Sequence, residues 1–203
     1  MKSVISLYSE NMQAVADLTI PSHVKFAEAY GWNQEAKIVD QENCLWEKLN
    51  LISEHLSQKH SAVLWLDADV LITNPKPITW ILDENPAADV FLTADINGLN
   101  AGAMLIRNTD WSKAFFYACK THGKTLFGDR PNGEQQAIQH FASVYPYAGI
   151  VHYIPQRELN SYHPDAYEYP KSHSAHWQNG DFALHLPSLE NKIRIEILKQ
   201  YIQ

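Results

Sequence analysis

Cysteine is scarce in this chain of 203 residues, and basic side chains are outnumbered by acidic ones. The two cysteines, Cys44 and Cys119, are too few for a disulfide scaffold and lack the spacing of a zinc site, so we expect both to be reduced residues of the core. With 16 Lys and Arg against 23 Asp and Glu, the formal net charge is −7. A nucleic-acid platform needs net positive charge or a dense basic stripe to neutralise phosphates, so this composition argues against one.

Long hydrophobic runs are also missing. No window approaches the ~20 consecutive apolar residues of a membrane span. The apolar stretch near the start, Val4–Tyr8, is shorter than the roughly 7–15 residues of a secretory signal, and no small-residue cleavage site follows it. We therefore expect no transmembrane segment and a cytoplasmic protein, either free or peripheral to the inner face of the membrane.

What the chain does contain is an alternation of strand-like and helix-like segments, which is typical of an α/β fold. Its length suits one compact domain or at most two small ones. The apolar patterns predict strands at 3–8, 36–39, 62–66, 89–93, 103–106, 150–154 and 182–186. They predict helices at 11–30 (broken or restarted at Pro21), at 45–56, after a cap at Asn108 or Thr109, from about Glu134, and at 188–202. Between these segments we expect a turn at 97–100, a mobile loop at 123–133 and an irregular stretch at 155–181.

The strongest sign of chemistry is the segment Leu64–Asp69, in which an apolar strand ends in Asp-x-Asp. Asp67 and Asp69 project to the same side if the backbone stays extended, and ligands of open α/β sheets bind outside the carboxyl ends of strands. Two neighbouring carboxylates repel each other. A hard divalent cation such as Mg²⁺ or Mn²⁺ relieves that repulsion and keeps coordination positions for phosphate oxygens. The alternative is that both acids only solvate the strand end and cap a turn.

A histidine near the end of the chain is a second candidate metal ligand. In an extended strand, His185 points away from the face that the apolar side chains of 182–186 form, so its imidazole is available to a metal. A lone strand histidine is more often a hydrogen-bonded structural residue. This signal is therefore weaker than the aspartate pair.

Two further patterns are less specific. His173 and His176 have a ligand-like spacing of i, i+3, but they lie in a segment that is expected to be irregular. The segment 97–102 places glycine on both sides of an asparagine just before a strand, so backbone and an amide can approach a small polar ligand closely. A plain glycine-rich hairpin explains the same segment equally well.

Taken in order, these segments resemble one family, the galactosyl/xylosyltransferases that include galactomannan galactosyltransferases, xyloglucan xylosyltransferases and fungal α-mannosyltransferases. The resemblance runs from about residue 46 to residue 185. It rests on Trp46-Glu47-Lys48, Trp65-Leu66-Asp67-Ala68-Asp69 with Asn74-Pro75, Gly98-Leu99-Asn100-Ala101-Gly102 with Arg107-Asn108, Glu134-Gln135, Pro155-Gln156-Arg157 with Asn160-Ser161-Tyr162, and Gly180-Asp181-Phe182 with His185.

This resemblance implies a single domain over residues 1–203 with the GT-A nucleotide-sugar fold, a mostly parallel mixed sheet flanked by helices. Residues 1–96 would mainly bind the nucleotide, and residues 97–203 would mainly bind the acceptor. The implied activity is transfer of a hexose or pentose, with retention of configuration, from a nucleotide diphosphate sugar to a glycan or another hydroxyl acceptor. A UDP-sugar is the expected donor.

The resemblance also implies Mn²⁺, or Mg²⁺, held by Asp67, Asp69 and His185 against the diphosphate. A metal there acts as a Lewis acid on the departing nucleotide, so no general acid is needed. The nucleotide pocket would further include Ser6, Tyr8, Ser9, Lys48, Ala68 and Lys192. Sugar hydroxyls would contact Asp95, Asn100 and Gly102.

Two residues at a helix start are the implied catalytic pair. The oxocarbenium-like transition state needs an oxygen on the β face of the sugar, a role assigned to Gln135, while Glu134 orients donor or acceptor hydroxyls. The alternative is that both are merely residues favoured in the first turn by the helix dipole.

The chain departs from the family's pattern in three respects. The metal-binding histidine is usually followed by Gly, Cys and a Lys that contacts phosphate, whereas here Lys192 stands at a different spacing. The Asp-Asp-Gln of some members is Gly133-Glu134-Gln135 here, which removes one acidic partner and bears on acceptor specificity. Eukaryotic members are membrane-anchored, and the lack of an anchor here favours a bacterial-type cytosolic enzyme.

Two other functions fit parts of the sequence. A phosphatase of the haloacid dehalogenase type also has Asp-x-Asp after an apolar strand, with Asp67 as its nucleophile. Leu71 stands where Thr or Val is expected, however, and no convincing acidic pair for Mg²⁺ follows. A non-catalytic sugar-binding module would use the aromatic-rich C-terminal part, and the aspartate pair would be incidental. The sequence leaves open which sugar is moved, which acceptor receives it and the oligomeric state.

Overall fold

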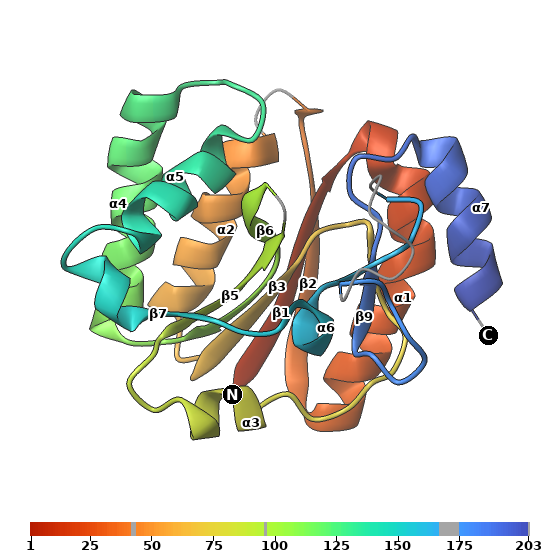
Figure 1. Ribbon diagram of the computed structural model, residues 1–203, viewed down its shortest axis with the longest axis horizontal. Coiled ribbons are helices and arrows are strands. Elements are labelled where there is room, and N and C mark those ends of the chain that lie inside the picture. Colours follow the sequence, from red (N-terminus) through yellow and green to blue (C-terminus); the bar gives the residue numbers. More distant parts are fainter. Residues whose placement is uncertain (42–43, 96, 167–174, 203) are drawn as a thin grey trace.

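The computed structural model describes residues 1–41, 44–95, 97–166 and 175–202. At its centre is a mixed sheet of six strands in the order β2-β1-β3-β6-β5-β7 (Figure 1). Parallel pairs join β1 to β2, β1 to β3 and β5 to β7, while β6 is antiparallel to both β3 and β5. The strands are β1 (Lys2–Ser9), β2 (Trp32–Val39), β3 (Ala62–Leu66), β5 (Val90–Asp95), β6 (Gly98–Arg107) and β7 (Val151–Tyr153).

A second, smaller sheet has the order β4-β9-β8 and is built from segments far apart in the sequence. Its strands are β4 (Val70–Ile72), β8 (Ser161–Tyr162) and β9 (Ala183–His185). β4 pairs antiparallel with β9, and Val70 lies opposite His185. This register brings the end of the chain beside the segment that follows β3.

Helices cover both faces of the central sheet, as Figure 1 shows, so the fold is a layered α/β arrangement. On one face lie α2 (Cys44–Ser57), α4 (Asp110–Phe127) and α5 (Gly133–Ala142). The other side carries α1 (Gln13–Tyr30), α7 (Asn191–Tyr201) and the short helices α3 (Trp80–Glu84) and α6 (Gln156–Leu159). The described residues also form the 3₁₀ turns η1 (Glu10–Met12) and η3 (Tyr147–Ile150).

Strand β3 shows why the sequence selects this arrangement. All five of its residues are buried. Val63 and Trp65 belong to the core on the side of α2, whereas Leu64 and Leu66 belong to the core on the side of α1. A continuous apolar run is therefore needed, because both faces of the strand are covered, and the prediction of a central strand at 62–66 is confirmed.

Helix α1 departs from its prediction because it continues through Pro21 without a break. Val15 and Ala16 before the proline and Phe26 after it are buried against the sheets, while Pro21 lies exposed. Packing on both sides of the proline compensates for the one backbone hydrogen bond that it removes. Gly31, with φ of 66°, ends the helix in the left-handed conformation, as the sequence predicted.

The predicted boundaries of two connections are wrong. β6 already begins at Gly98, so most of the predicted turn at 97–100 is strand, with Asn100 opposite Thr93 of β5. Helix α4, capped by Thr109 as predicted, extends to Phe127, so only 128–132 remain of the predicted loop at 123–133. Gly123 belongs to this helix because α5 packs closely on it: an added Cβ would lie 2.4 Å from the Cβ of Ala137.

The last third of the chain is more regular than expected. Within the described part of 155–181, α6 and β8 form, and β9 and α7 follow close to their predicted positions. Of the two histidines with ligand-like spacing, only His176 can be placed, because His173 lies outside the described residues. His176 is buried and forms an isolated bridge with Tyr162.

A buried histidine ties α1 to both sheets. Because the carbonyl of Val70 can only accept, Nε2 of His23 donates to it at 2.7 Å, and Nδ1 accepts from the hydroxyl of Ser6 at 3.0 Å. Burial lowers the pKa of His23 from its ordinary value of 6.5 to about 4, against a smaller opposite effect of the hydrogen bond to Val70. The imidazole is therefore neutral in the folded protein.

The depressed pKa of His23 predicts a loss of stability in acid. The unfolded chain binds a proton at His23 below about pH 6.5, but the folded chain does so only near pH 4. Neutral His23 therefore stabilises the folded protein fully above about pH 6.5, and this stabilisation is lost as the pH falls from 6.5 to 4. Between pH 7 and pH 4 we expect the free energy of unfolding to fall by about 3 kcal/mol more than in a His23→Gln variant. Urea unfolding at both pH values measures this, and equal losses in the two proteins would contradict it.

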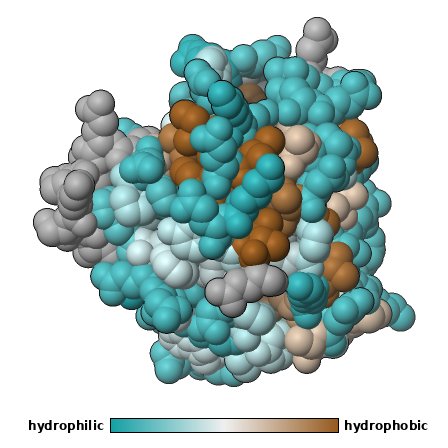
Figure 2. Space-filling view, turned by 90° about the vertical axis from the view of Figure 1, so that its right-hand side faces the viewer, coloured by the Kyte–Doolittle hydropathy of each residue, from teal (hydrophilic) through white to brown (hydrophobic). Residues whose placement is uncertain are grey.

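The side of the molecule formed by α1 and α7 shows apolar surface broken into bands by polar side chains (Figure 2). Ile193 and Ile202 contribute exposed apolar side chains there. Scattered exposure of this kind is ordinary for a globular surface. In the described part of the chain, no helix combines the length and the apolar character that crossing a bilayer requires.

Candidate active site

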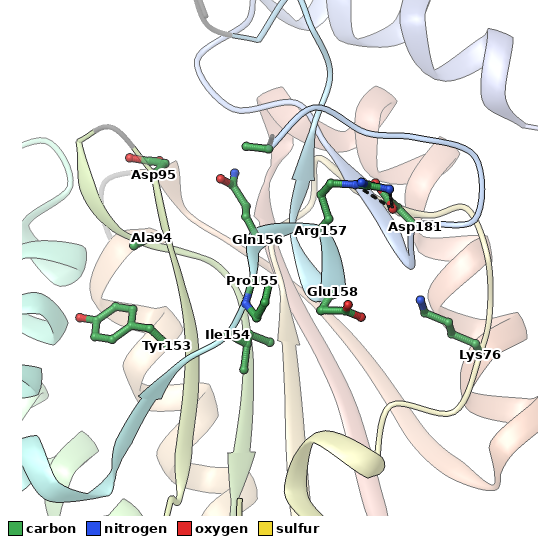
Figure 3. A pocket seen from close by; sticks show the side chains of 11 residues that line it. Lys76, Ala94, Asp95, Tyr153, Ile154, Pro155, Gln156, Arg157, Glu158 and Asp181 are labelled. Carbon is green, nitrogen blue, oxygen red and sulfur yellow. Dashed lines mark hydrogen bonds and ion pairs between the residues drawn. The ribbon is translucent and has the colours of Figure 1, made fainter. Parts of the chain in front are cut away.

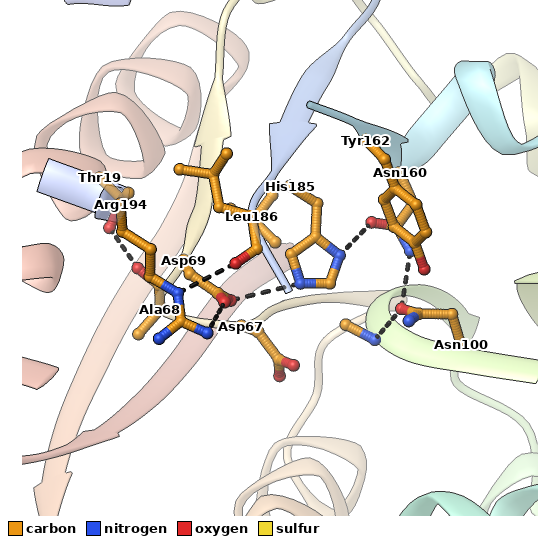
Figure 4. A network of polar contacts seen from close by, with 12 residues as sticks. Thr19, Asp67, Ala68, Asp69, Asn100, Asn160, Tyr162, His185, Leu186 and Arg194 are labelled. Atoms are coloured by element: carbon orange, nitrogen blue, oxygen red, sulfur yellow. Dashed lines mark hydrogen bonds and ion pairs between the residues drawn. The ribbon is translucent and has the colours of Figure 1, made fainter. Parts of the chain in front are cut away.

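Asp67, Asp69 and His185 lie together at the end of β3 (Figure 4). The chain leaves β3 with the N–H of Asp67 donating to the carbonyl of Gly102 at 2.7 Å and enters β4, which pairs with β9. The N–H of Leu186 donates to the carbonyl of Asp69 at 3.2 Å and so extends this pairing. One ligand atom from each of the three side chains lies within 4.8 Å of the others.

A chain of hydrogen bonds determines which nitrogen of His185 carries a proton. The N–H of Gly102 donates to Oδ1 of Asn100 at 2.8 Å, and Nδ2 of Asn160 donates to the same oxygen at 2.9 Å. Oδ1 of Asn160 therefore faces Nδ1 of His185 at 2.7 Å and accepts a hydrogen bond from its N–H. The lone pair of Nε2 then faces Oδ1 of Asp69, 3.3 Å away. Nε2 and the carboxylate oxygen are both electron-rich, so at this distance they need either a cation between them or a second proton, on Nε2. A histidine that carries its proton on Nδ1 and leaves Nε2 free is in the form that binds a metal through Nε2.

Asp69 is a buried carboxylate that contacts one guanidinium and one imidazole. Its Oδ2 lies 3.0 Å from the guanidinium of Arg194, and its Oδ1 faces His185. Burial alone would raise the pKa of Asp69, but the His185 ring, in the form that carries a proton on Nε2 as well, and Arg194 outweigh it and lower the pKa. The side chain is therefore ionised at neutral pH, as a metal ligand must be.

Asp67 belongs to a second charge cluster around Lys48 of α2. Nζ of Lys48 lies 3.0 Å from Oδ1 of Asp67 and 3.5 Å from Oε1 of Glu134, and it donates to the carbonyl of Ala101 at 3.3 Å. Burial would lower the pKa of Lys48, but the two carboxylates outweigh it and raise the pKa to about 12. The indole of Trp65 also donates to Oδ1 of Asp67 at 2.8 Å, so two donors hold this oxygen in place.

These groups line one cavity of about 280 Å³. Glu134 is only 4% exposed, and its Oε2 has no hydrogen-bond partner in the part of the chain that the structure describes. A buried carboxylate oxygen without a partner is costly unless a ligand donates to it. The cavity also includes Cys44, which was predicted in the core but is half-buried, whereas Cys119 is buried as expected.

Most of the site residues predicted from the sequence border this cavity. They are Tyr8, Lys48, Asp67, Ala68, Asp69, Asn100, Gly102, Glu134, Gln135 and His185. The amide oxygen of Gln135 accepts from the N–H of Ala101 at 3.0 Å, which fixes the side chain beside β6. Gly102 has no room for a side chain, because an added Cβ would lie 2.2 Å from Cε1 of His185.

Four predicted residues lie elsewhere than in this lining. Ser6 donates to His23, and the hydroxyl of Ser9 donates to Asn11. Lys192 is exposed on α7. Asp95 borders a second cavity and contacts the lining of the first through Asn100, whose Nδ2 donates to it at 3.3 Å. The proposed binding roles of these four residues stay predictions.

Arg194 and Asn160 belong to the site, although neither was assigned a role from the sequence. Arg194 projects from α7 into the cavity and is held by the carbonyl of Leu186 at 2.9 Å. The sequence pointed to Arg194 only as a second basic residue, two positions after the predicted phosphate-binding Lys192. Asn160 stood in a matched motif, but its contact with His185 depends on the pairing of β8 with β9, which the sequence does not reveal.

The fold is that of the GT-A glycosyltransferases, and the end of its strand β3 presents Asp-x-Asp and a histidine. The sequence profile of the galactosyl transferase GMA12/MNN10 family matches residues 78–192, more than half of the chain. The chain belongs to this family, and the resemblance noted in the sequence is confirmed.

Two curated relatives come from Schizosaccharomyces pombe (strain 972 / ATCC 24843). The probable alpha-1,2-galactosyltransferase gmh2 is 34% identical over 97 residues, which cover 47% of this chain and 26% of that protein. The probable alpha-1,2-galactosyltransferase gmh1 is 29% identical over 188 residues, which cover 73% of this chain and 55% of that protein. The chain thus spans about a quarter and about half of the lengths of these relatives.

Solved glycosyltransferase structures share the fold over nearly the whole chain. One is a glycosyltransferase involved in the glycosylation of the major capsid of PBCV-1, with a TM-score of 0.70 at 16% identity and 98% of both chains covered. Another is the galactosyltransferase LgtC, in complex with donor and acceptor sugar analogs, with a TM-score of 0.61 at 12% identity and coverage of 99% of this chain and 96% of that one. The family and these folds do not favour a phosphatase or a non-catalytic sugar-binding module.

Proposed function

We propose that the chain transfers a hexose or pentose from a nucleotide diphosphate sugar, a UDP-sugar in the first instance, to a saccharide or another hydroxyl acceptor with retention of configuration. The observation that carries this proposal is the convergence of Asp67, Asp69 and His185 within 4.8 Å at the end of β3. Membership of the galactosyl transferase GMA12/MNN10 family supports transfer of a sugar, and the alpha-1,2-galactosyltransferase relatives make a galactosyl donor the first to test.

The three side chains suit Mn²⁺ or Mg²⁺. The two carboxylates suit both ions, whereas an imidazole ligand favours the transition metal Mn²⁺ over Mg²⁺; the proton on Nδ1 of His185 leaves Nε2 available for coordination. Such an ion, when bound, supplies Lewis-acid stabilisation of the leaving diphosphate. Asp67, Asp69 and His185 would hold it, while Lys48 keeps Asp67 in position and balances its charge.

Arg194 would complete the binding of the diphosphate. Its guanidinium faces Asp69 at 3.0 Å at the border of the cavity and donates to Oδ1 of Asn191 at 2.8 Å, so a short movement that exchanges the contact with Asn191 would bring donors to phosphate oxygens. Guanidinium groups bind phosphate through charge-assisted, bidentate hydrogen bonds. In this proposal Arg194 takes the place of the phosphate-contacting lysine of the family.

The sugar would lie between the diphosphate and α5. Glu134 offers the unpartnered Oε2 to a sugar hydroxyl, and Gln135 places its amide beside β6, where an oxygen can stabilise positive charge at the anomeric carbon. The metal would then be shared between two parts of the chain, since 1–96 supplies the aspartates for nucleotide binding and 97–203 supplies His185 and the sugar-binding helix. We retain this division as part of the proposal.

The proposal is tested by incubating the protein with UDP-hexoses and UDP-pentoses, with and without Mn²⁺, and following UDP release. One donor is expected to be hydrolysed slowly in the presence of Mn²⁺ only, and NMR of the freed sugar is expected to show the α anomer first. Calorimetry is expected to show saturable UDP binding that depends on the metal. Absence of both UDP binding and donor hydrolysis with either Mn²⁺ or Mg²⁺ would contradict the proposal.

The role of Arg194 is tested against Lys192, two positions earlier on the same helix. Replacing Arg194 by Gln is expected to weaken UDP binding about tenfold to a hundredfold at saturating Mn²⁺, because one or two charge-assisted hydrogen bonds to phosphate are lost. Lys192→Gln is expected to change the affinity less than about twofold, because Lys192 is exposed outside the cavity. Calorimetry measures both, and the reverse order of effects would assign the phosphate contact to Lys192.

A further inference from the structure

Helix α1 carries three polar side chains on the face that it buries. Thr19, Ser22 and His23 are spaced i, i+3 and i+4, so they lie on one side of the helix. Thr19 and His23 are fully buried, and Ser22 is half-buried. A hydroxyl or an imidazole inside a protein is costly without a hydrogen-bond partner, so each of the three needs a partner on the element that packs against this face.

Two of the partners are backbone groups on the outer edge of β4. Nε2 of His23 donates to the carbonyl of Val70 at 2.7 Å, and the hydroxyl of Ser22 accepts from the N–H of Ile72 at 3.0 Å. The other edge of β4 pairs with β9. Residues two apart in a strand present their backbone groups to the same edge. Side chains of α1 therefore take the place of a neighbouring strand along β4.

Thr19 continues this contact into the turn that precedes β4. The N–H of Val70 donates to the carbonyl of Asp67 at 3.1 Å and closes a β-turn, whose central peptide group joins Ala68 to Asp69. The carbonyl of this group, that of Ala68, accepts from the hydroxyl of Thr19 at 2.6 Å (Figure 4). The two carbonyls of its own helix that this hydroxyl also approaches are 3.3 and 3.4 Å away. Because a hydroxyl has one proton to donate, the turn is its main partner.

The orientation of this central peptide group determines where the side chain of Asp69 points. Rotating the group changes ψ of Ala68 and φ of Asp69, which is the difference between the common β-turn types. Ala68 is buried, so its carbonyl would have to turn to find another partner if the hydroxyl were removed. Asp69 would then move relative to Asp67, whose Oδ1 is held separately by Lys48 and Trp65.

The histidine side of the candidate metal site is held by a separate ion pair. Arg157 of α6 donates to Asp181, two residues before β9, with Nε 3.0 Å from Oδ2 and the terminal nitrogen 2.7 Å from Oδ1 (Figure 3). Oδ2 of Asp181 also accepts from the hydroxyl of Ser161 in β8 at 2.9 Å. These contacts tie β8 to β9, the strand that carries His185, without the help of α1. A change at Thr19 is therefore expected to act on the aspartates and not on the histidine.

We propose that Thr19 is a positioning residue of the metal site: its hydroxyl holds the turn between β3 and β4 so that Asp67 and Asp69 face one cation together with His185. This proposal rests on the proposed function, because Thr19 has such a task only if these side chains bind a metal. It concerns a residue of α1 that does not itself line the cavity.

The test compares three variants of α1. Thr19→Val removes the hydroxyl and keeps the shape of the side chain, whereas Thr19→Ser keeps the hydroxyl. Ser22→Ala is the matched control, because it also removes one hydrogen bond from α1 to this segment, but at Ile72, three residues after Asp69. Electron paramagnetic resonance measures Mn²⁺ affinity without nucleotide. We expect about tenfold to hundredfold weaker binding in Thr19→Val, the usual cost of losing a hydrogen bond that supports a metal ligand, and affinities within about threefold of the wild type in the other two variants.

Two measurements on the metal-free protein separate positioning from a general loss of stability. Urea unfolding is expected to show a lower midpoint in both Thr19→Val and Ser22→Ala, because each leaves a backbone group of a buried residue without its partner. Hydrogen exchange is followed at the amide of Val70, which closes the turn. It is expected to be at least about tenfold faster in Thr19→Val than in Ser22→Ala, because only the first variant loosens the turn itself.

UDP binding by the wild type distinguishes failure of this proposal from failure of the proposed function. If the wild type binds Mn²⁺ and UDP but Thr19→Val binds Mn²⁺ as tightly as Ser22→Ala does, this proposal is overturned and the proposed function stands. Equal exchange rates at Val70 in these two variants, or Mn²⁺ binding by Thr19→Ser as weak as that of Thr19→Val, would also overturn it. A wild type that binds neither Mn²⁺ nor UDP would contradict both.

Discussion

Replacing Asp69 by Asn is expected to lower sugar transfer and donor hydrolysis by at least about a thousandfold. The substitution keeps the shape of a side chain that is only 6% exposed but removes the charge that would hold a divalent cation and that now faces Arg194. Metal-assisted stabilisation of a leaving diphosphate is worth several kcal/mol, and one factor of ten in rate corresponds to about 1.4 kcal/mol. Initial rates of UDP release and Mn²⁺ binding by electron paramagnetic resonance measure the two effects.

The matched control is Asp83→Asn, in the short helix α3, where the aspartate is exposed. It removes the same charge from the protein without touching the cavity, so both Mn²⁺ binding and the rate are expected to stay within about twofold of the wild type. A fully active Asp69→Asn protein, or one that still binds Mn²⁺ and UDP as tightly as the control, would remove Asp69 from the proposed metal site.

Gly102→Ala is expected to have the second largest effect, although it changes no charge or ligand. The added Cβ would lie 2.2 Å from Cε1 of His185 and 2.9 Å from Oδ1 of Asn100. The imidazole must then leave its place between Asn160 and Asp69. Loss of such positioning typically costs about tenfold to a hundredfold in metal affinity, and the steric conflict should lower the free energy of unfolding by about 1–3 kcal/mol.

Gly149→Ala controls for the cost of adding a methyl group, because nothing lies within 4 Å of a Cβ built there. Its metal affinity and stability are expected to match those of the wild type. Mn²⁺ titration and urea unfolding are the measurements. Unchanged Mn²⁺ affinity in folded Gly102→Ala protein would show that the position of His185 does not matter for the metal.

The sheet was the part of the fold most open to prediction. The apolar run of β3 and the caps of α1 and α4 are local signals, because a strand covered on both faces must be apolar throughout and a helix end needs a particular residue. The passage of α1 through Pro21 was not predictable, since it depends on packing against distant strands. Gly123 was predicted to lie in a loop for the same reason. A side chain at position 123 would clash with α5, and the sequence does not show that α5 packs there.

The site divides in the same way. Asp67 and Asp69 could be recognised from two positions and the strand before them, but the contribution of His185 depends on the antiparallel pairing of β4 with β9 across more than a hundred residues. His185 could still be predicted as a metal ligand, because the resemblance to a family implied that role. Arg194 had no comparable motif, because its place beside Asp69 follows from where α7 packs.

The central claim is that Asp67, Asp69 and His185 hold one divalent cation against a nucleotide diphosphate. The most direct test is a crystal structure with UDP and Mn²⁺, with anomalous data collected to locate the manganese. The account predicts a single anomalous peak about 2.0–2.3 Å from a carboxylate oxygen of Asp69 and from Nε2 of His185, with the diphosphate oxygens on its open side. Bound UDP with no manganese among these three side chains, or UDP bound away from this cavity, would contradict it.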